Sequence, residues 1–488
     1  MRVAEEAAFA RAISAEALME EAGAGIARAI TKFFPRAGKC IVFAGKGHNA
    51  GDAFVAARCL AHAEWEIETR LIFPENKLSD LTKQKLRKLG TRPARRSLAP
   101  PHAGAGRPII VLDGLLGLGA HPPLRDPIRD ACRQINSLGK EGAWVFAIDL
   151  PAGLDGDSGA TDDDCVVADF TITIGGAKSG LLADSAIDFV GRLEVVPLAE
   201  LRSDGLPLLQ PELAIPESLR GLLPRRKYSA YKNQFGRIGI VAGSRGFTGA
   251  AVMCSLGALR AGAGLVELFV PEEIYEIVAA AAAPEVMVKP VKSYVDLLDE
   301  PIDVWAVGPG LGQSRADEIR ALMCDAPQPM VIDADGLNLL AKEIGALSNV
   351  RGPRLLTPHP GEMKRLFPAE KISRAETATK FCAEYAVTLL LKGSRTIVGE
   401  AGRPLSFNTT GNPGMATGGM GDVLTGVCGA LLGAKLAPYD AARLGAWLCG
   451  RAAELAIFNG EASEESLLPR DVIEGLGLAF IDLRTSSR

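Results

Sequence analysis

Short apolar segments alternate with amphipathic ones along almost the whole chain. Four segments in the first half and six in the second have the length and the β-branched or apolar composition of buried strands. They are residues 41–44, 109–112, 144–148, 170–174, 237–242, 265–270, 304–307, 330–333, 355–357 and 388–391. Intervening segments such as 52–62 and 315–324 have the spacing of amphipathic helices. The alternation predicts a mostly parallel, doubly wound sheet between two helical layers, a three-layer α/β/α arrangement.

This rhythm breaks between residues 203 and 234, where prolines recur and no strand pattern is present. Proline removes a backbone donor and disfavours helix at the preceding residue. We therefore expect a linker at 206–225, with a boundary near Leu222, between one domain at 1–205 and another at 226–488. The two halves show no repeat and have different glycine-rich segments, so two different α/β domains are predicted.

Composition narrows the class of protein. A length of 488 residues suggests two or three domains. The chain has 54 Lys and Arg against 58 Asp and Glu, a net charge of −4, which argues against nucleic acid or an anionic membrane as the main partner. No apolar stretch reaches the roughly 18 residues of a membrane span. The nine cysteines are scattered and form no CxxC, as is typical of reduced thiols. We expect a soluble, cytoplasmic protein.

The first candidate site is a glycine-rich segment, GKGHNAGD at 45–52, between the strand at 40–44 and a helix expected to begin near Ala53. A small-residue turn into a helix exposes amides that hold a phosphate. The segment matches neither the dinucleotide fingerprint nor the P-loop, and a tight structural turn is the alternative. Asp113 and Asp149 end two further predicted strands beside glycine turns, so polar groups from three strands are expected at one sheet edge. Either aspartate alone is also compatible with a turn or a helix cap.

Several motifs of the first half belong together: 18–23, 45–58, 113–119, 147–159 and 168–171, with Lys178. Together they resemble the NAD(P)HX epimerases, the YjeF N-terminal domain, over roughly the first 200 residues. The resemblance implies a Rossmann-like domain that interconverts the R and S C6 hydrates of NADH and NADPH and uses a potassium ion. The hydrated carbon is a hemiaminal, so its configuration can invert through acid–base catalysis.

The resemblance also implies roles for residues. Asp149 is the implied acid/base, Asn49 and Asp113 the implied oxygen ligands of potassium, with Ala152 at the same ion. The implied hydrate-binding residues are His48, Asn49, Ala50, Gly51, Asp52, Gly117, Leu118, Gly119, Ala120, His121, Pro122, Pro123 and Asp149. The chain departs from the family at His48, Ala50 and Ala53. Ala152 replaces a serine and removes a hydroxyl near the expected ion.

The second candidate site lies at 408–426, where glycines precede Asp422 and an apolar run at 423–432 predicts a buried helix. Amides at such a helix start can hold a transferring phosphoryl group, and an aspartate there can accept a proton from the attacking hydroxyl. Close helix–sheet packing also selects glycine, but it does not ask for a carboxylate.

Matching segments extend over about 250 residues: 231–236, 242–251, 307–312, 333–338, 357–362 and 391–394. With the Gly-x-Gly-Asp signature, they resemble the ribokinase-like, ADP- or ATP-dependent NAD(P)HX dehydratases, the YjeF C-terminal domain. The implied reaction phosphorylates the C6 hydroxyl of the S hydrate and eliminates phosphate, which is a better leaving group than hydroxide. Between ADP and ATP, the fused arrangement favours ADP by analogy.

On this resemblance Asp422 is the general base, and the Gly418–Gly421 amides stabilise the phosphoryl group. The implied nucleotide-binding residues are Lys392, Gly393, Ser394, Arg395, Thr396, Gly418, Gly419 and Gly421. Ala250, Gly312, His359 and Asp422 are implied to line the hydrate pocket. Magnesium would be held through water by Glu362. His359 is equally compatible with a structural turn, and Asp333 and Asp335 with strand-end caps, so these two aspartates are not assigned to catalysis.

Three interpretations follow. The first is a bifunctional repair enzyme for NADHX and NADPHX, expected to be a homo-oligomer. The second is a ribokinase-like kinase of a small metabolite, which would accumulate a phosphoester. The third makes the first domain a nucleotide-sensing or partner-binding module that has lost catalysis. The sequence leaves open the preference between NADHX and NADPHX.

Overall fold

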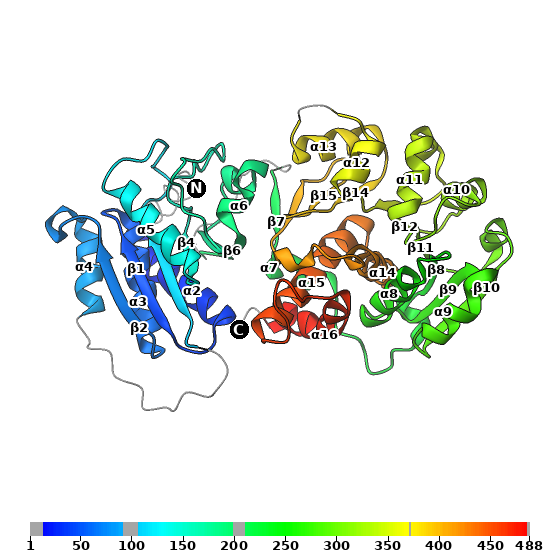
Figure 1. The fold of residues 1–488 in the computed structure, drawn as a ribbon, viewed down its shortest axis with the longest axis horizontal. Helices are drawn as coiled ribbons and strands as arrows, with labels where there is room; N and C mark the ends of the chain where they lie inside the picture. The colour runs from blue at the N-terminus through cyan, green and yellow to red at the C-terminus, as the bar shows by residue number, and fades with distance from the viewer. Residues whose placement is uncertain (1–12, 91–105, 199–209, 370–371, 486–488) are drawn as a thin grey trace. The chain divides into compact units, whose positions relative to one another are not determined.

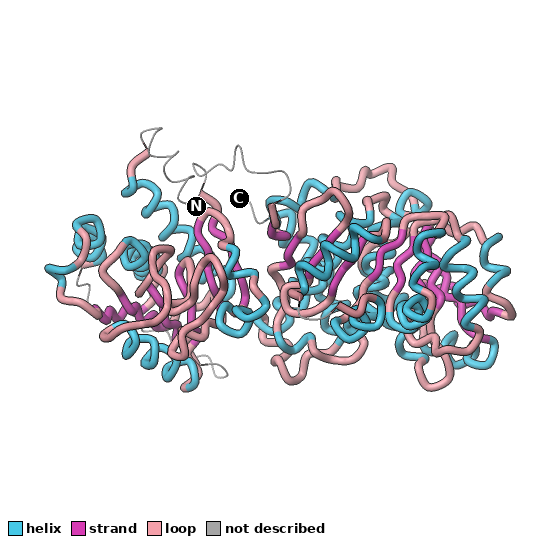
Figure 2. Tube along the Cα trace, turned by 90° about the horizontal axis from the view of Figure 1, so that it is seen from above, coloured by secondary structure: helices cyan, strands magenta, loops and turns pink. Residues whose placement is uncertain are grey.

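The computed structural model describes residues 13–90, 106–198, 210–369 and 372–485 (Figure 1). The chain divides into two compact units, Met1–Leu206 and Pro207–Arg488. In each unit the strands run through the middle and helices lie on both sides (Figure 2). The prediction of two mostly parallel α/β domains is confirmed.

The first unit contains a six-stranded sheet in the order β2-β1-β3-β4-β5-β6, and its neighbouring strands pair in parallel. The strands are β1 (Lys39–Ala44), β2 (Glu66–Leu71), β3 (Ile109–Gly114), β4 (Trp144–Ile148), β5 (Phe170–Ile174) and β6 (Arg192–Val196). The helices are α2 (Ala15–Phe33), α3 (His48–His62), α4 (Asp80–Leu89), α5 (Ile128–Lys140) and α6 (Ile187–Val190). Alternating strand residues such as Ile41, Val111 and Val145 join a core cluster with α5, because neighbouring positions point to opposite faces.

The second unit contains a ten-stranded sheet in the order β10-β9-β8-β11-β12-β13-β14-β15-β16-β7. Pairing is parallel except at β14–β15 and β15–β16. The strands are β7 (Glu212–Ala214), β8 (Arg237–Val241), β9 (Leu265–Pro271), β10 (Val286–Val291), β11 (Val304–Val307), β12 (Met330–Ile332), β13 (Arg354–Leu356), β14 (Thr388–Leu391), β15 (Ile397–Gly399) and β16 (Ser406–Asn408).

The helices of this unit are α7 (Pro216–Leu219), α8 (Thr248–Arg260), α9 (Tyr275–Ala281), α10 (Ala316–Asp325), α11 (Ala334–Lys342), α12 (Pro360–Leu366), α13 (Arg374–Glu384), α14 (Met420–Gly433), α15 (Pro438–Phe458) and α16 (Pro469–Thr485). Helix α14 is buried from Val423 to its end, as its apolar sequence predicts. It crosses α8 at glycines: a Cβ at Gly426 would lie 2.0 Å from the carbonyl oxygen of Cys254. The two backbones approach this closely only because glycine has no side chain.

The segment expected as a linker, 206–225, contains regular structure of the second unit. Strand β7 pairs in parallel with β16, and Pro216 occupies the first turn of α7. The expectation that this segment holds no strand is therefore wrong. Its prolines flank a three-residue edge strand, where a missing backbone donor interrupts no ladder on the outer side.

Two further expectations can be compared with the structure. Each of the nine cysteines is a free thiol, as the spacing predicts. None of the helices in the described ranges combines the length and the apolar character needed to cross a membrane.

Candidate functional sites

The carboxyl ends of β1, β3 and β4 meet at one edge of the first sheet, as expected for parallel strands. Asp113 pairs in register with Phe43 on one side and Ala147 on the other. The helix after β1 differs from the prediction. It begins at His48 rather than near Ala53, so residues 48–52 form the first turns of α3 and only 45–47 remain as the turn. A Cβ at Gly45 would meet the Leu115 carbonyl oxygen at 2.0 Å, which explains the tight entry.

Asp149 occupies a strained and enclosed position after β4. Its backbone φ is +68°, a conformation that is uncommon outside glycine. The side chain is 7% exposed, and Oδ1 accepts a hydrogen bond from the Ile174 amide at 3.1 Å. The Lys178 ammonium contacts the same oxygen and donates to Thr173 Oγ1 at 3.0 Å and to the Ile174 carbonyl at 3.1 Å. The structure thus adds Lys178, which the sequence singled out only as part of a motif.

Asp113, Asn49 and Ala152, the implied potassium ligands, lie at the same edge of the sheet: Asp113 contacts Ala152, and Asn49 contacts the backbone after β3 and at the end of β4. Their role as ion ligands stays a prediction. Asp113 is fully buried, and its oxygens accept the Leu115 amide at 3.1 Å and the Ala152 amide at 2.7 Å. Burial raises the pKa of Asp113 to about 7, although these two amides oppose the shift. Asn49 donates Nδ2 to the carbonyls of Leu116 (2.7 Å) and Ile148 (3.0 Å), so its amide oxygen is not used in either bond.

The segment Gly117–Pro123, expected to bind the hydrate, lies next to α3. A Cβ at Gly117 would lie 3.6 Å from the Asn49 Cβ. His121 is exposed, and its Nδ1 is 2.6 Å from Asp155 Oδ2. Hydrogen bonds to His121 and Ser158 hold the pKa of Asp155 well below its usual range. The structure therefore anchors this loop at His121.

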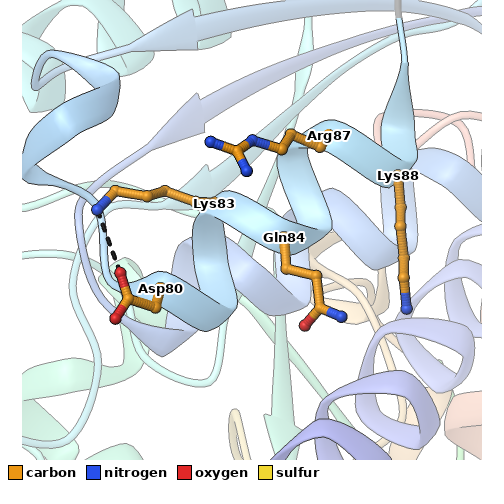
Figure 3. A pocket seen from close by; sticks show the side chains of 5 residues that line it. All are labelled: Asp80, Lys83, Gln84, Arg87 and Lys88. Carbon is orange, nitrogen blue, oxygen red and sulfur yellow. Dashed lines mark hydrogen bonds and ion pairs between the residues drawn. The ribbon is translucent and has the colours of Figure 1, made fainter.

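A separate hollow of about 530 Å³ runs along α4 (Figure 3). Its lining side chains, Asp80, Lys83, Gln84, Arg87 and Lys88, include none of the predicted site residues.

Residues at the N-terminal end of α4 also hydrogen-bond to the first glycine turn. The Ser79 amide donates to the Lys46 carbonyl at 3.0 Å, and Thr82 Oγ1 donates to the Gly47 carbonyl at 2.9 Å.

In the second unit, polar residues follow β12, β13 and β14 at the carboxyl edge of the sheet. Lys392 follows β14, and its Nζ lies 2.6 Å from Oδ1 of Asp333, which follows β12. Thr425 Oγ1 of α14 donates to the other Asp333 oxygen at 2.9 Å. Asp333 is 1% exposed. It occupies the N-cap position of α11, yet its side chain makes no capping hydrogen bond. The cap interpretation therefore does not account for its carboxylate.

Asp422 is the third residue of α14 and lies in the electrostatic field of this pair. Burial and then the Asp333 charge raise the pKa of Asp422 to about 6, while Lys392 opposes the shift. The carboxylate is thus mostly ionised at pH 7 but more basic than an ordinary aspartate. The preceding Gly421 leaves room for the cluster: a Cβ there would lie 3.2 Å from Lys392 Nζ and 3.4 Å from Asp333 Oδ2.

His359 and Glu362 form a capping box at the start of α12. His359 Nδ1 accepts the amides of Gly361 (3.0 Å) and Glu362 (3.4 Å), and Glu362 Oε2 accepts the His359 amide at 2.8 Å. The structural alternative for His359 is thus observed, and its place in a hydrate pocket stays a prediction. Glu362 Oε2 also lies 3.9 Å from Lys392 Nζ, which connects this cap to the Asp333 pair.

The loop expected to bind the nucleotide, 392–396, is supported from α13. Arg374 donates to the carbonyls of Ser394 (2.9 Å) and Arg395 (2.8 Å).

The predicted pocket residues Ala250 and Gly312 have glycine-rich surroundings. A Cβ at Gly310 would approach the Ala250 Cβ to 3.0 Å, and the Gly312 amide donates to Asp335 Oδ2 at 2.8 Å. Asp335 therefore fixes the 310–312 turn.

Both halves of the chain match known protein families. The model of the YjeF-related protein N-terminus matches residues 15–180, and the model of NAD(P)H-hydrate dehydratase matches 238–474. The bifunctional NAD(P)H-hydrate repair enzyme Nnr of Moorella thermoacetica is 34% identical, over 94% of this chain and 91% of that protein. The chain belongs to the bifunctional NAD(P)H-hydrate repair enzyme family.

A second relative and a solved structure are also similar to this chain. The bifunctional NAD(P)H-hydrate repair enzyme of Gloeobacter violaceus is 35% identical and is covered, like this chain, over 95% of its length. A crystal structure of the ADP/ATP-dependent NAD(P)H-hydrate dehydratase of Bacillus subtilis, co-crystallised with ATP/Mg²⁺, is 28% identical. The match covers 56% of this chain and 98% of that one, with a TM-score of 0.48.

Proposed function

We propose that the chain repairs hydrated NADH and NADPH in two steps. The first domain interconverts the R and S hydrates, and the second dehydrates the S hydrate with ADP as phosphoryl donor, giving AMP and phosphate. The observation that carries the proposal is the Asp422 carboxylate in the first turn of α14, beside the Lys392–Asp333 pair. Family membership over nearly the whole chain supports both steps.

In the second domain, Asp422 would take the proton of the C6 hydroxyl as the hydroxyl oxygen attacks the terminal phosphorus of ADP, and the P–O bond to the departing AMP breaks. The new C–O–P linkage is then cleaved at carbon: the ring nitrogen lone pair expels phosphate, and loss of the C5 proton restores the ring double bond. The amides at the start of α14 and the nearby Lys392 ammonium would stabilise the charge of the transferring group.

Magnesium fits this site only as an ion that keeps most of its water. Among the described residues, no group of three or more His, Cys, Asp or Glu side chains is placed to hold a metal ion. Glu362 is the carboxylate next to Lys392 and would hold the hydrated ion together with phosphate oxygens. The ion would neutralise phosphate charge when bound.

In the first domain, Asp149 would exchange a proton with the C6 hydroxyl or the ring nitrogen while the hemiaminal opens and closes. Lys178 keeps this carboxylate in one orientation through the contacts described above. The residues around Asp113 also fit a monovalent cation. Asp113 is a buried carboxylate that accepts the Leu115 and Ala152 backbone amides, and Asn49 adds an amide oxygen. Potassium there would neutralise Asp113.

The competing kinase function is not favoured by the comparisons, and its product distinguishes it. Hydrated NADH, separated into R and S forms, is incubated with the full chain and ADP or ATP. We expect both forms to yield NADH, with inorganic phosphate released in equal amount. A stable phosphoester that accumulates without recovery of reduced-nicotinamide absorbance would contradict the proposal. We also propose a cytoplasmic location, which the scattered spacing of the nine cysteines supports.

A further inference from the structure

The second domain contains a buried carboxylate that the proposed reaction does not use directly. Asp333 lies at the end of β12, yet its two oxygens bind residues from two other elements. One oxygen contacts Lys392 after β14, and the other accepts the Thr425 hydroxyl of α14. Three segments that are far apart in the sequence therefore meet on this one side chain. A carboxylate retained only to cap α11 would bind the α11 amides instead, and it does not.

The placement of Lys392 makes this contact important for Asp422. The ammonium lies beside the first turn of α14, because a Cβ at Gly421 would be 3.2 Å from Nζ. Asp422 is the next residue of that turn. A lysine so close to a catalytic carboxylate tends to pair with it, which stabilises the charged form and makes it a weaker base. Asp333 offers the ammonium a nearer partner, at 2.6 Å.

We propose that Asp333 is a positioning residue, which holds Lys392 toward the phosphoryl site and keeps it from pairing with Asp422. The inference rests on the proposed dehydratase function and deepens it. One negative and one positive charge balance within the Asp333–Lys392 pair. Asp422 is thereby left as a separate carboxylate able to accept the hydroxyl proton.

The other charged groups around this cluster are accounted for. Within the described residues, the charges that act on Asp422 are those of Asp333 and Lys392. Glu362 of α12 acts on Lys392 from 3.9 Å. The Asp422 charge also acts on the Cys254 thiol of α8. Burial raises the pKa of this thiol, so the thiol stays neutral. Strands β8 and β11 carry no charged side chain near this edge: the Arg237 side chain pairs with Glu267, and β11 is entirely apolar.

The test is the pH profile of kcat/KM for dehydration of the S hydrate by the full chain. The acidic limb of this profile reports the pKa of the general base in the free enzyme. For Asp333→Asn we expect the acidic limb to move down by about one pH unit or more, because a like charge is removed and Lys392 is released toward Asp422. The kcat/KM on the plateau above this limb should fall by about tenfold, because a weaker base accepts the hydroxyl proton less readily. An acidic limb that stays in place would overturn the inference.

Two further variants separate this role from a structural one. Lys392→Met removes the positive charge, so the limb should move to higher pH; a shift to lower pH would contradict the inference. Thr425→Val removes the other hydrogen bond to Asp333 but leaves every charge, so the limb should stay in place while the free energy of unfolding falls. A limb that moves with Thr425→Val as far as with Asp333→Asn would reduce Asp333 to a packing role. Absence of dehydration by the wild-type chain would instead refute the proposed function itself.

Discussion

In both domains a lysine donates to a buried aspartate at the carboxyl edge of the parallel strands. Lys178 pairs with Asp149, and Lys392 pairs with Asp333. The aspartates have different roles in the proposed reactions, since Asp149 is the acid/base of its domain and Asp333 supports another carboxylate. A buried pair of this kind costs more when one partner is lost than it contributes when intact, because the remaining charge stays out of water.

This asymmetry gives a prediction for Lys178. In Lys178→Met, Asp149 keeps its burial and its Ile174 amide but loses the ammonium. We expect epimerisation to fall by about 10²-fold or more, because the carboxylate then loses the contact that fixes its orientation toward the hydrate. The first unit should be destabilised by about 3 kcal/mol. Dehydration of the pure S hydrate, measured in the same preparation, should stay at the wild-type rate.

The exposed Lys140 supplies the matched control, since Lys140→Met removes one charge from the end of α5. That variant should epimerise as the wild type does. Epimerisation by Lys178→Met at close to the control rate would show that the ion pair serves stability alone.

The buried Asp113 makes potassium testable without an activity assay. If the ion neutralises this carboxylate, potassium chloride should raise the Tm of the first unit more than sodium or choline chloride at equal ionic strength. In Asp113→Asn the difference between the salts should disappear. Thermal unfolding followed by calorimetry measures both effects, and equal Tm values for the wild type in the three salts would refute the ion assignment.

How far sequence predicts these sites depends on how local their parts are. Asp422 and its glycines are contiguous, so their spacing shows a carboxylate at a helix start. Asp333 acquires its role from Lys392 and Thr425, which are 59 and 92 residues away, and only the fold brings them together. Its sequence neighbourhood is equally compatible with a helix cap, which is why the sequence left it unassigned.

The distinction between local and long-range information also holds for the strands and helices. Every strand predicted from an apolar run is present, because strands buried on both faces require continuous apolar residues. The strands missed by the pattern include β2, β6, β7 and β10, which lie at the sheet edges. Edge strands face solvent on one side, and β2 accordingly has the sequence EIETRL. The sequence predicts the start of α3 too late, because the first turns of this helix contain Gly51 and polar residues rather than an apolar stripe.

The crossing of α8 and α14 gives a prediction for the element that positions Asp422. In Gly426→Ala the new Cβ would meet the Cys254 carbonyl, so the helices must separate. We expect the free energy of unfolding of the second unit, measured in urea, to fall by about 1–3 kcal/mol. In Gly477→Ala of α16, by contrast, the Cβ meets nothing within 4 Å, and helix propensity should raise stability by up to about 1 kcal/mol. Equal effects of the two substitutions would mean that the crossing tolerates a side chain.

At the scale of the whole molecule, one chain carries two sites whose reactions follow each other. The epimerase site works on a substrate that the dehydratase site consumes in one configuration only, so each domain is useful without contact between them, provided that the hydrate diffuses. Loss of the Asp149 carboxylate should therefore remove epimerisation and leave dehydration, and loss of the Asp422 carboxylate should do the reverse. Asp149→Asn should convert only the S hydrate to NADH, whereas Asp422→Asn should interconvert the hydrates and produce no NADH.

This independence leads to a complementation experiment with full-length chains. A mixture of the Asp149→Asn and Asp422→Asn variants should recover NADH from the pure R hydrate, although neither does so alone beyond the slow spontaneous epimerisation. Chromatography of the two hydrates and reduced-nicotinamide absorbance follow the reaction. The rate should rise with the concentration of the Asp422→Asn variant until dehydration limits it. If the mixture stays as inactive on the R hydrate as Asp149→Asn alone, while each variant keeps its remaining step, the hydrate must pass between sites of the same molecule, and free diffusion between two independent domains is refuted.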